Sequence, residues 1–167
     1  MSNMIETNEL WIEISIAEQR LLLKRGDELL KEYLVSTASN GAGEHFGSEC
    51  TPRGWHKVRA KVGEGQPLNA VFVGRRPTGE IYSAELGAKH PGRDWVLTRI
   101  LWLSGLEPGK NRLGRVDTMR RYIYIHGTPY EEELGSPGSH GCVRMGNCDI
   151  IKLFDAVDVG TKVFIHE

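Results

Sequence analysis

The sequence predicts a mainly β protein that folds as one domain over residues 1–167. Many short segments alternate apolar and polar residues, which is typical of strands with one buried face. The chain also contains 20 glycines and 7 prolines, residues that mark turns between short strands. Only one segment, which follows Cys142, has clear helical spacing. We therefore expect short strands, many turns and one clear helix.

The alternation assigns nine strands and leaves loops rich in Gly and Pro between them. The predicted strands are residues 10–16, 20–24, 29–35, 55–62, 70–74, 80–83, 95–103, 121–126 and 162–165. We expect a turn at 76–79, which reads RPTG, and a loop at 87–94. The strand at 121–126, RYIYIH, alternates strictly and should deliver His126 at its end.

The predicted helix covers residues 148–157, where Ile150, Leu153 and Phe154 recur at helical spacing. Asn147 is the expected N-cap, because its short polar side chain can accept hydrogen bonds from the first turn. Asp149 would place a negative charge at the positive end of the helix dipole.

The composition excludes several classes of protein. The net charge of −1 gives no indication of nucleic-acid or membrane binding. The N-terminus has no basic region followed by an apolar core, and the odd count of three cysteines does not suggest a disulfide framework. We therefore expect a cytoplasmic protein, with a periplasmic or cell-wall location if export uses another route. The oligomeric state is not indicated.

The segment 89–121 is locally basic, with eight Lys or Arg against three Asp or Glu. Such a run is commonly a solvated face. Beside a functional site it also suits a substrate that carries several carboxylates.

The stretch 125–145, IHGTPYEEELGSPGSHGCVRM, has the features of a nucleophilic site. Cys142 lies in a Gly-rich, polar context, and a turn-rich segment can fold His126 back against it. A thiol needs a neighbouring base to act as a nucleophile at neutral pH. We therefore predict Cys142 as nucleophile and His126 as base, with the nearby Gly127 carbonyl as a candidate for orienting the imidazole.

The residues around Cys142 are candidates for binding. Free N–H groups of Gly141 and Cys142 could form an oxyanion hole. On a strand, His140 would share a face with the thiol, where it could contact substrate or the oxyanion, or be a second candidate base. Arg144 could bind a substrate carboxylate or form a surface salt bridge. Ser139 is expected to support the loop through hydrogen bonds.

A metal site is the main chemical alternative. Its ligands would be His126, His140, Cys142 and Cys148, but these lack the paired short spacings of structural zinc sites. We expect no metal and no cofactor. Cys50 and Cys148 look incidental, although Cys148 at a helix start is the second candidate for a reactive thiol.

The spaced His126-Gly127-Thr128 and the run Ser139 to Met145, SHGCVRM, resemble the signature of the L,D-transpeptidase (YkuD-type) catalytic domain. The opening strands, the segment TPRGWHKV and the closing helix and strand are also similar to this family. The resemblance implies a mainly β, sandwich-like domain with a helix near the active site.

The resemblance also implies acyl transfer on peptidoglycan stem peptides. Cys142 would attack the carbonyl of the third, L-centred residue of a tetrapeptide and release the terminal D-alanine, leaving a thioester. By match, Cys142 is the nucleophile, His126 the base and Gly127 the source of the orienting carbonyl. His140 and Arg144 match positions that contact the oxyanion or substrate, and a carbapenem is expected to acylate Cys142.

Three functions remain open. We expect water to be the acceptor, which makes the protein an L,D-carboxypeptidase acting on soluble muropeptides in recycling. The first alternative is an L,D-transpeptidase that crosslinks peptidoglycan or exchanges D-amino acids. The second is a non-catalytic muropeptide-binding domain.

Overall fold

The computed structural model describes residues 4–167, in ten strands, two α-helices and two single 3₁₀ turns. Residues 1–3, which begin the segment examined for a leader peptide, lie outside the described part. The strands are β1 (Leu10–Ser15), β2 (Arg20–Arg25), β3 (Glu28–Ser36), β4 (Gly54–Val62), β5 (Ala70–Val73), β6 (Arg76–Ile81), β7 (Val96–Gly105), β8 (Tyr124–Gly127), β9 (Val143–Met145) and β10 (Lys162–His166). The helices are α1 (Ala84–Lys89) and α2 (Asn147–Ala156), and the 3₁₀ turns are η2 (Gly114–Val116) and η3 (Glu131–Glu133).

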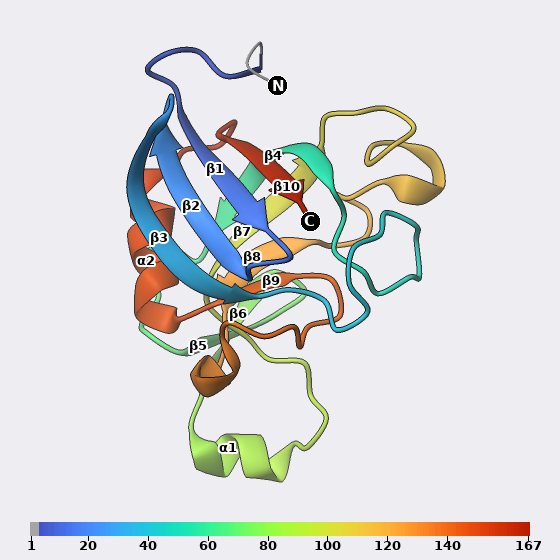
Figure 1. The fold of residues 1–167 in the computed structure, drawn as a ribbon. Helices are drawn as coiled ribbons and strands as arrows, with labels where there is room; N and C mark the ends of the chain where they lie inside the picture. The colour runs from blue at the N-terminus through green and yellow to red at the C-terminus, as the bar shows by residue number, and fades with distance from the viewer. Residues whose placement is uncertain (1–3) are drawn as a thin grey trace.

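All ten strands belong to one sheet in the order β4-β10-β1-β2-β3-β9-β8-β7-β5-β6. Because β4 also pairs with β7, the sheet closes on itself and its two halves pack face to face (Figure 1). The β5–β6 hairpin extends from this ring, and α1 lies beyond it at the lower end of the view. The predicted mainly β, sandwich-like fold is confirmed.

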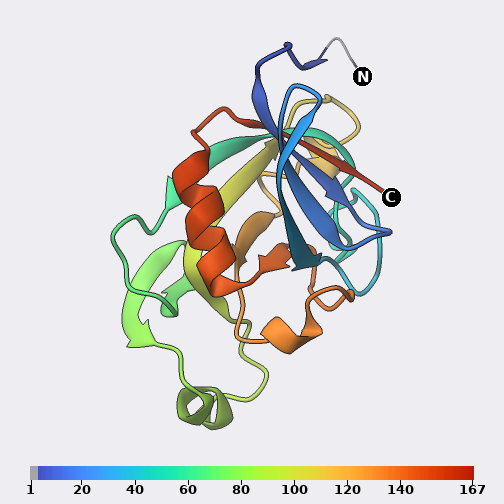
Figure 2. The same ribbon diagram turned by 60° about the vertical axis from the view of Figure 1, so that its left-hand side comes forward.

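The core lies inside the closed sheet. Each strand of the ring contributes inward apolar side chains, since successive residues of a strand point to opposite faces. Helix α2 packs against β7 and β8 and crosses one side of the molecule (Figure 2). Its Ile150, Leu153 and Phe154 are buried in this core, so the predicted amphipathic helix is confirmed to within one residue at each end. None of the helices in residues 4–167 has the length and apolar character needed to cross a membrane.

The region 74–94 differs from the prediction in two ways. The hairpin turn lies at Gly74 and Arg75, both with positive φ, so residues 76–79 begin strand β6 instead of forming the turn. The expected loop at 87–94 begins inside helix α1. The Ser83 hydroxyl accepts a hydrogen bond from the Leu86 N–H and so caps this helix. A six-residue helix is too short for its hydrophobic periodicity to be recognised in the sequence.

The predicted strand at 121–126 is wrong in its first half. Arg121 and Tyr122 lie in a turn, and Tyr122 has a φ of 57°. The Asp117 carboxylate accepts hydrogen bonds from the Leu113 and Arg120 N–H groups and thereby stabilises this turn. The strand begins only at Tyr124 and, as expected, carries His126 near its end.

The predicted N-cap of α2 is also wrong. Gly146 occupies the cap position and makes no side-chain cap hydrogen bond, whereas Asn147 is the first helical residue. The Asn147 side chain is buried and bonds residues outside the helix.

Candidate active site

The two central residues of the site lie on neighbouring parallel strands. In the register of β8 and β9, Ile125 pairs with Val143 and His126 with Arg144. Ile125 and Val143 point into the core. His126 and Cys142 therefore lie on the opposite face, as diagonal neighbours across the strand pair. The turn-rich segment between them returns the chain to this position, as the sequence predicted.

His126 is buried, and its Nδ1 lies 2.7 Å from the carbonyl oxygen of Gly127. A carbonyl only accepts, so Nδ1 carries the proton and Nε2 has a free lone pair. Nε2 makes no hydrogen bond to any residue in 4–167. Burial lowers the pKa of His126, an effect partly offset by the Gly127 hydrogen bond and the Asp94 carboxylate. The resting imidazole is thus neutral and able to take up a proton.

Cys142 is half-buried just before β9, and its sulfur is held by two backbone groups. The Tyr124 N–H donates to Sγ at 3.3 Å, and the thiol donates to the Tyr122 carbonyl at 3.4 Å. Burial, helped by the Asp94 carboxylate, raises the pKa of Cys142 to about 12. The Tyr124 N–H opposes this rise. The resting pair is therefore a neutral thiol beside a neutral imidazole, and proton transfer must accompany attack on a substrate.

The turn before Cys142 is fixed by hydrogen bonds. The Ser139 hydroxyl donates to the Cys142 carbonyl and accepts from the Gly141 N–H. The Thr51 hydroxyl donates to the Gly141 carbonyl at 2.9 Å. Gly141 has a φ of 132°, and a Cβ there would lie 3.0 Å from Ile123. Glycine is therefore required by both conformation and space.

These bonds correct one expectation about the oxyanion hole. The Gly141 N–H was expected to be free, but it is engaged by Ser139. Of that predicted pair, only the Cys142 N–H remains a candidate donor. The Tyr124 N–H, which sequence reasoning missed, donates to Sγ and so helps to orient the thiol.

A pocket of about 230 Å³ brings the predicted residues together. Cys142, His126, His140, Ser139 and Arg144 all contribute to its lining. His140 is exposed in a bend, not on a strand as considered from the sequence, because β9 begins only at Val143. The catalytic and binding roles assigned to these residues stay predictions.

Arg144 is buried, and its Nη2 lies 3.9 Å from the Asp94 carboxylate. Its guanidinium also lies over the Tyr130 ring, at 5.6 Å from the ring centre. The long contact with an exposed Asp94 is a weak ion pair. Arg144 is thus a cation at the pocket wall, and its role in binding a substrate carboxylate stays a prediction.

Two charged residues of the lining, Asp94 and Arg121, were missed by sequence reasoning. Arg121 donates to the carbonyls of Gly43, Glu44 and Cys50, and so ties the loop 43–50 to the pocket. In the basic segment 89–121, Arg121 is the only cationic side chain that lines the pocket. The excess of positive charge in segment 89–121 therefore predicted the charge of the thiol pocket only in part.

Asn147 is a third missed residue, and it supports the strand end that carries His126. Its Nδ2 donates to the Thr128 carbonyl at 2.8 Å, and its Oδ1 accepts from the Thr98 hydroxyl at 2.5 Å. A Cβ on Gly127 would lie 2.4 Å from this Oδ1. Thr98 has a φ of 73°, which is unusual for a β-branched residue and marks local strain. The network fixes the backbone whose carbonyl bonds the imidazole.

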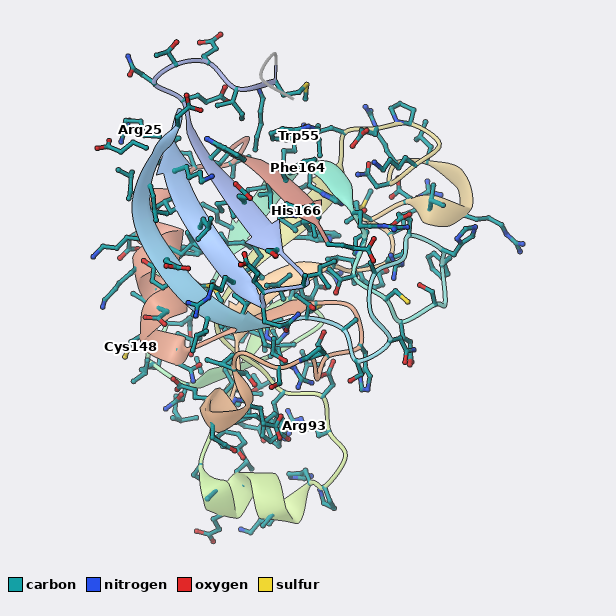
Figure 3. The ribbon with its side chains drawn as sticks, viewed as in Figure 1. Arg25, Trp55, Arg93, Cys148, Phe164 and His166 are labelled. Carbon is teal, nitrogen blue, oxygen red and sulfur yellow. The ribbon has the colours of Figure 1, made fainter. Side chains whose placement is uncertain are left out.

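A larger cavity of about 600 Å³ lies elsewhere, under the N-terminal segment, and includes Trp11, Trp55 and Arg25 in its lining. Trp55 and Arg25 are labelled in the upper part of Figure 3. This cavity contains no Cys or His, so its size does not make it the reactive site.

The remaining cysteines lie outside the thiol pocket. Cys148 is exposed at the outer side of α2 (Figure 3), and the Cys50 thiol lies near the Asn40 and Ser48 carbonyls. Within residues 4–167, no three His, Cys, Asp or Glu side chains gather to form a metal site.

A thiol and a buried imidazole with an open nitrogen, set on a closed β-sheet, define a cysteine enzyme. A family model described as the L,D-transpeptidase catalytic domain (YkuD) matches residues 9–165. The chain belongs to this family.

Individual comparisons agree with the assignment. The Escherichia coli (strain K12) protein "Probable L,D-transpeptidase YbiS" is 52% identical over 48 residues, 28% of this chain and 16% of that protein. L,D-transpeptidase 3 from Mycobacterium tuberculosis, solved with a faropenem-derived adduct, aligns over 95% of this chain and 60% of its own, with 17% identity and a TM-score of 0.58. The structure of L,D-transpeptidase LdtMt1 in complex with imipenem covers 94% of this chain and 58% of its own, with 20% identity and a TM-score of 0.57. The chain spans at most 27% of the curated relatives it matches and about three fifths of these solved chains.

Proposed function

We propose that this protein cleaves peptidoglycan stem tetrapeptides by cysteine-dependent acyl transfer, releasing the terminal D-alanine through a thioester at Cys142. The observation that carries the proposal is the open Nε2 of the buried His126, on the same sheet face as Cys142. Membership of the L,D-transpeptidase family supports a peptidoglycan or muropeptide substrate.

The proposed reaction begins with the neutral pair. As Sγ attacks the carbonyl of the third residue, its proton passes to His126 Nε2, and the Gly127 carbonyl stabilises the resulting imidazolium through Nδ1–H. The Cys142 N–H is the candidate donor to the oxyanion. His126 then returns the proton to the departing amine of D-alanine, and the C–N bond breaks. Water next attacks the thioester, gives up a proton through His126 and releases Cys142 as a thiol.

Water is the acceptor we favour. The pocket of about 230 Å³ is smaller than the roughly 300–1,000 Å³ of common ligand sites. It offers room for the donor acyl group and a water molecule, but little for a second peptide. The predicted cytoplasmic location would suit soluble muropeptides, and fractionation of cells that produce the protein would check it.

The acceptor can be tested by mass spectrometry of a tetrapeptide muropeptide incubated with the protein. We expect a tripeptide product, and we expect it to dominate even with excess D-amino acid or a second stem peptide. Dominant exchange or dimer products would instead establish a transpeptidase. This second function is favoured by the relatives that carry the L,D-transpeptidase name.

Acylation separates both enzymes from a non-catalytic binding domain. Imipenem is expected to add one inhibitor mass to the intact protein, and Cys142→Ala is expected to abolish the adduct. The complex of LdtMt1 with imipenem motivates the choice of reagent. A folded, reduced protein that stays unmodified would contradict the proposed nucleophile.

A further inference from the structure

Beside the thiol pocket lies a cluster of two arginines and two aromatic residues, Arg59, Arg75, Trp102 and Tyr122, here called the arginine–aromatic cluster. The Arg75 guanidinium lies 4.7 Å from the Trp102 ring centre and 4.8 Å from that of Tyr122. Arg59 lies over the same Trp102 ring, at 5.8 Å. The Trp102 indole N–H donates to the Met119 carbonyl at 3.1 Å, which fixes the ring. The cluster is therefore a held arrangement of cations on aromatic faces.

Arg75 presents an unpaired charge. It occupies the turn of the β5–β6 hairpin, and its Nη1 donates to the Tyr124 hydroxyl at 2.9 Å. A guanidinium has five N–H donors in a planar fork, so this bond leaves most of them unused. Neither Arg75 nor Arg59 has a carboxylate within 4.0 Å among residues 4–167, whereas Arg93 pairs with Glu80 at 2.8 Å. The half-buried Arg75 thus lacks a counterion within the described chain.

The cluster is continuous with the thiol pocket. Tyr122 belongs to both, and Tyr124, which bonds Arg75, also lines the pocket and donates its N–H to Cys142 Sγ. Trp102 pairs with Tyr124 in the register of β7 and β8. Adjacent strands lie about 4.8 Å apart, and β8 lies between Trp102 and Cys142. The Cα atoms of Trp102 and Cys142 are therefore roughly 10 Å, or two strand spacings, apart. A ligand held at the thiol can reach the cluster with a group about three extended residues away.

We propose that the arginine–aromatic cluster is a carboxylate-binding subsite for the substrate that acylates Cys142, in which Arg75 is the main residue that binds the carboxylate. The inference rests on the proposed function, because it takes Cys142 as the point of acyl transfer. Planar guanidinium groups bind carboxylates with two parallel hydrogen bonds, and stacking on aromatic rings holds the fork in orientation. The subsite selects a donor peptide with a second carboxylate roughly 10 Å from the scissile carbonyl.

Binding measurements test the subsite without turnover. In a Cys142→Ala background, calorimetry would compare a stem tetrapeptide with forms in which each carboxylate in turn is converted to an amide. We expect at least one amide form to bind about tenfold more weakly, the worth of a charged hydrogen bond. Adding Arg75→Gln should remove this preference. Arg76→Gln is the matched control, because Arg76 is the next residue of the hairpin, is exposed and makes no cation–π contact in the described chain.

Several outcomes overturn the proposal: no carboxylate preference, no detectable binding, or carboxylate preferences that all survive Arg75→Gln. A single surviving preference is assigned to Arg144, which lines the thiol pocket. An equal loss in Arg76→Gln would also reject the subsite, since it would indicate general charge attraction. Arg75→Lys and a thermal melt of each variant show whether a loss of preference comes from misfolding of the hairpin. Arg75→Lys keeps the positive charge and should keep only part of the carboxylate preference. D-alanine release by the intact enzyme is scored separately. If D-alanine is released but no carboxylate preference depends on Arg75, only the subsite is rejected. If the Arg75-dependent preference is present but no D-alanine is released, only the proposed reaction is rejected.

Discussion

Two buried histidines, His56 and His126, differ in one hydrogen bond. Each Nδ1 donates to a backbone carbonyl, that of Gly54 at 3.0 Å and that of Gly127 at 2.7 Å. The Nε2 of His56 accepts a bond from the Thr118 hydroxyl at 3.0 Å, whereas the Nε2 of His126 has no partner in residues 4–167. Burial lowers the pKa of both. A satisfied imidazole stabilises the fold, and an imidazole with an open nitrogen beside a thiol is available for chemistry.

The largest effect is expected from removal of the Cys142 thiol, whose proton the open Nε2 of His126 would accept. Cys142→Ala should abolish D-alanine release, because no other cysteine lines the pocket. Cys50→Ser and Cys148→Ser are the matched controls and should retain most activity. Product mass spectrometry measures all three, and full activity of Cys142→Ala would remove the basis of the mechanism.

The two histidines should differ in their effect on acylation. His126→Ala should slow acylation by the folded fraction by about 10² to 10⁴, the usual worth of a general base. His56→Ala should lower the midpoint and leave the acylation rate of the folded fraction nearly unchanged. Stopped-flow acylation and calorimetry separate these effects. If His140→Ala altered the pH profile more than His126→Ala, the base would be assigned to the wrong histidine.

The pH dependence of stability tests the satisfied histidine. Burial lowers the pKa of His56 from 6.5 to about 4, so the unfolded chain takes up the proton first as pH falls. The contribution of the neutral, buried His56 to the free energy of unfolding is complete above pH 6.5. As pH falls toward 4, this contribution decreases by on the order of 3 kcal/mol. Urea unfolding at several pH values measures it. His56→Gln, which donates and accepts without titrating, should flatten the curve relative to the wild-type protein.

The smallest effect is expected from changes at Asn147, which supports the backbone that positions the open Nε2 of His126. Asn147→Ala removes the bond to the Thr128 carbonyl, so the Gly127–Thr128 backbone should be less well fixed. We expect kcat to fall about tenfold with little change in KM, as for a lost hydrogen bond that acts through position. Thr98→Val removes the partner hydroxyl and should have a similar but smaller effect, whereas Thr98→Ser should retain activity. An unchanged kcat in Asn147→Ala would make the network structural only.

The sequence predicted elements whose signal is local. The alternation in Ile12 and Ile14 and the helical spacing of Ile150, Leu153 and Phe154 reflect burial of one face, and both assignments hold in the structure. The pairing of His126 with Cys142 could also be anticipated, because the turn-rich segment between them is visible in the chain.

The remaining features depend on partners far away in sequence. Asn147 has the composition of an N-cap, yet it bonds Thr98, which lies 49 residues away. The Ser139 hydroxyl accepts a hydrogen bond from the Gly141 N–H, and this bond depends on the geometry of a turn, not on residue type. Arg75 reaches Tyr124 across 49 residues. Tertiary contacts of this kind leave no periodic pattern in the sequence.

The position of β10 has a consequence for how the protein is made. This strand comes last in chain order but lies between β1 and β4, which it joins in the closed sheet. On the ribosome, β1 to β3 can pair as they emerge, but the ring cannot close until residues 162–166 have left the exit tunnel. Cys142 and His126 will already have been synthesised by then, without a finished core beneath them. The pocket of a nascent chain is therefore expected to lack its supporting closed sheet until β10 has left the exit tunnel.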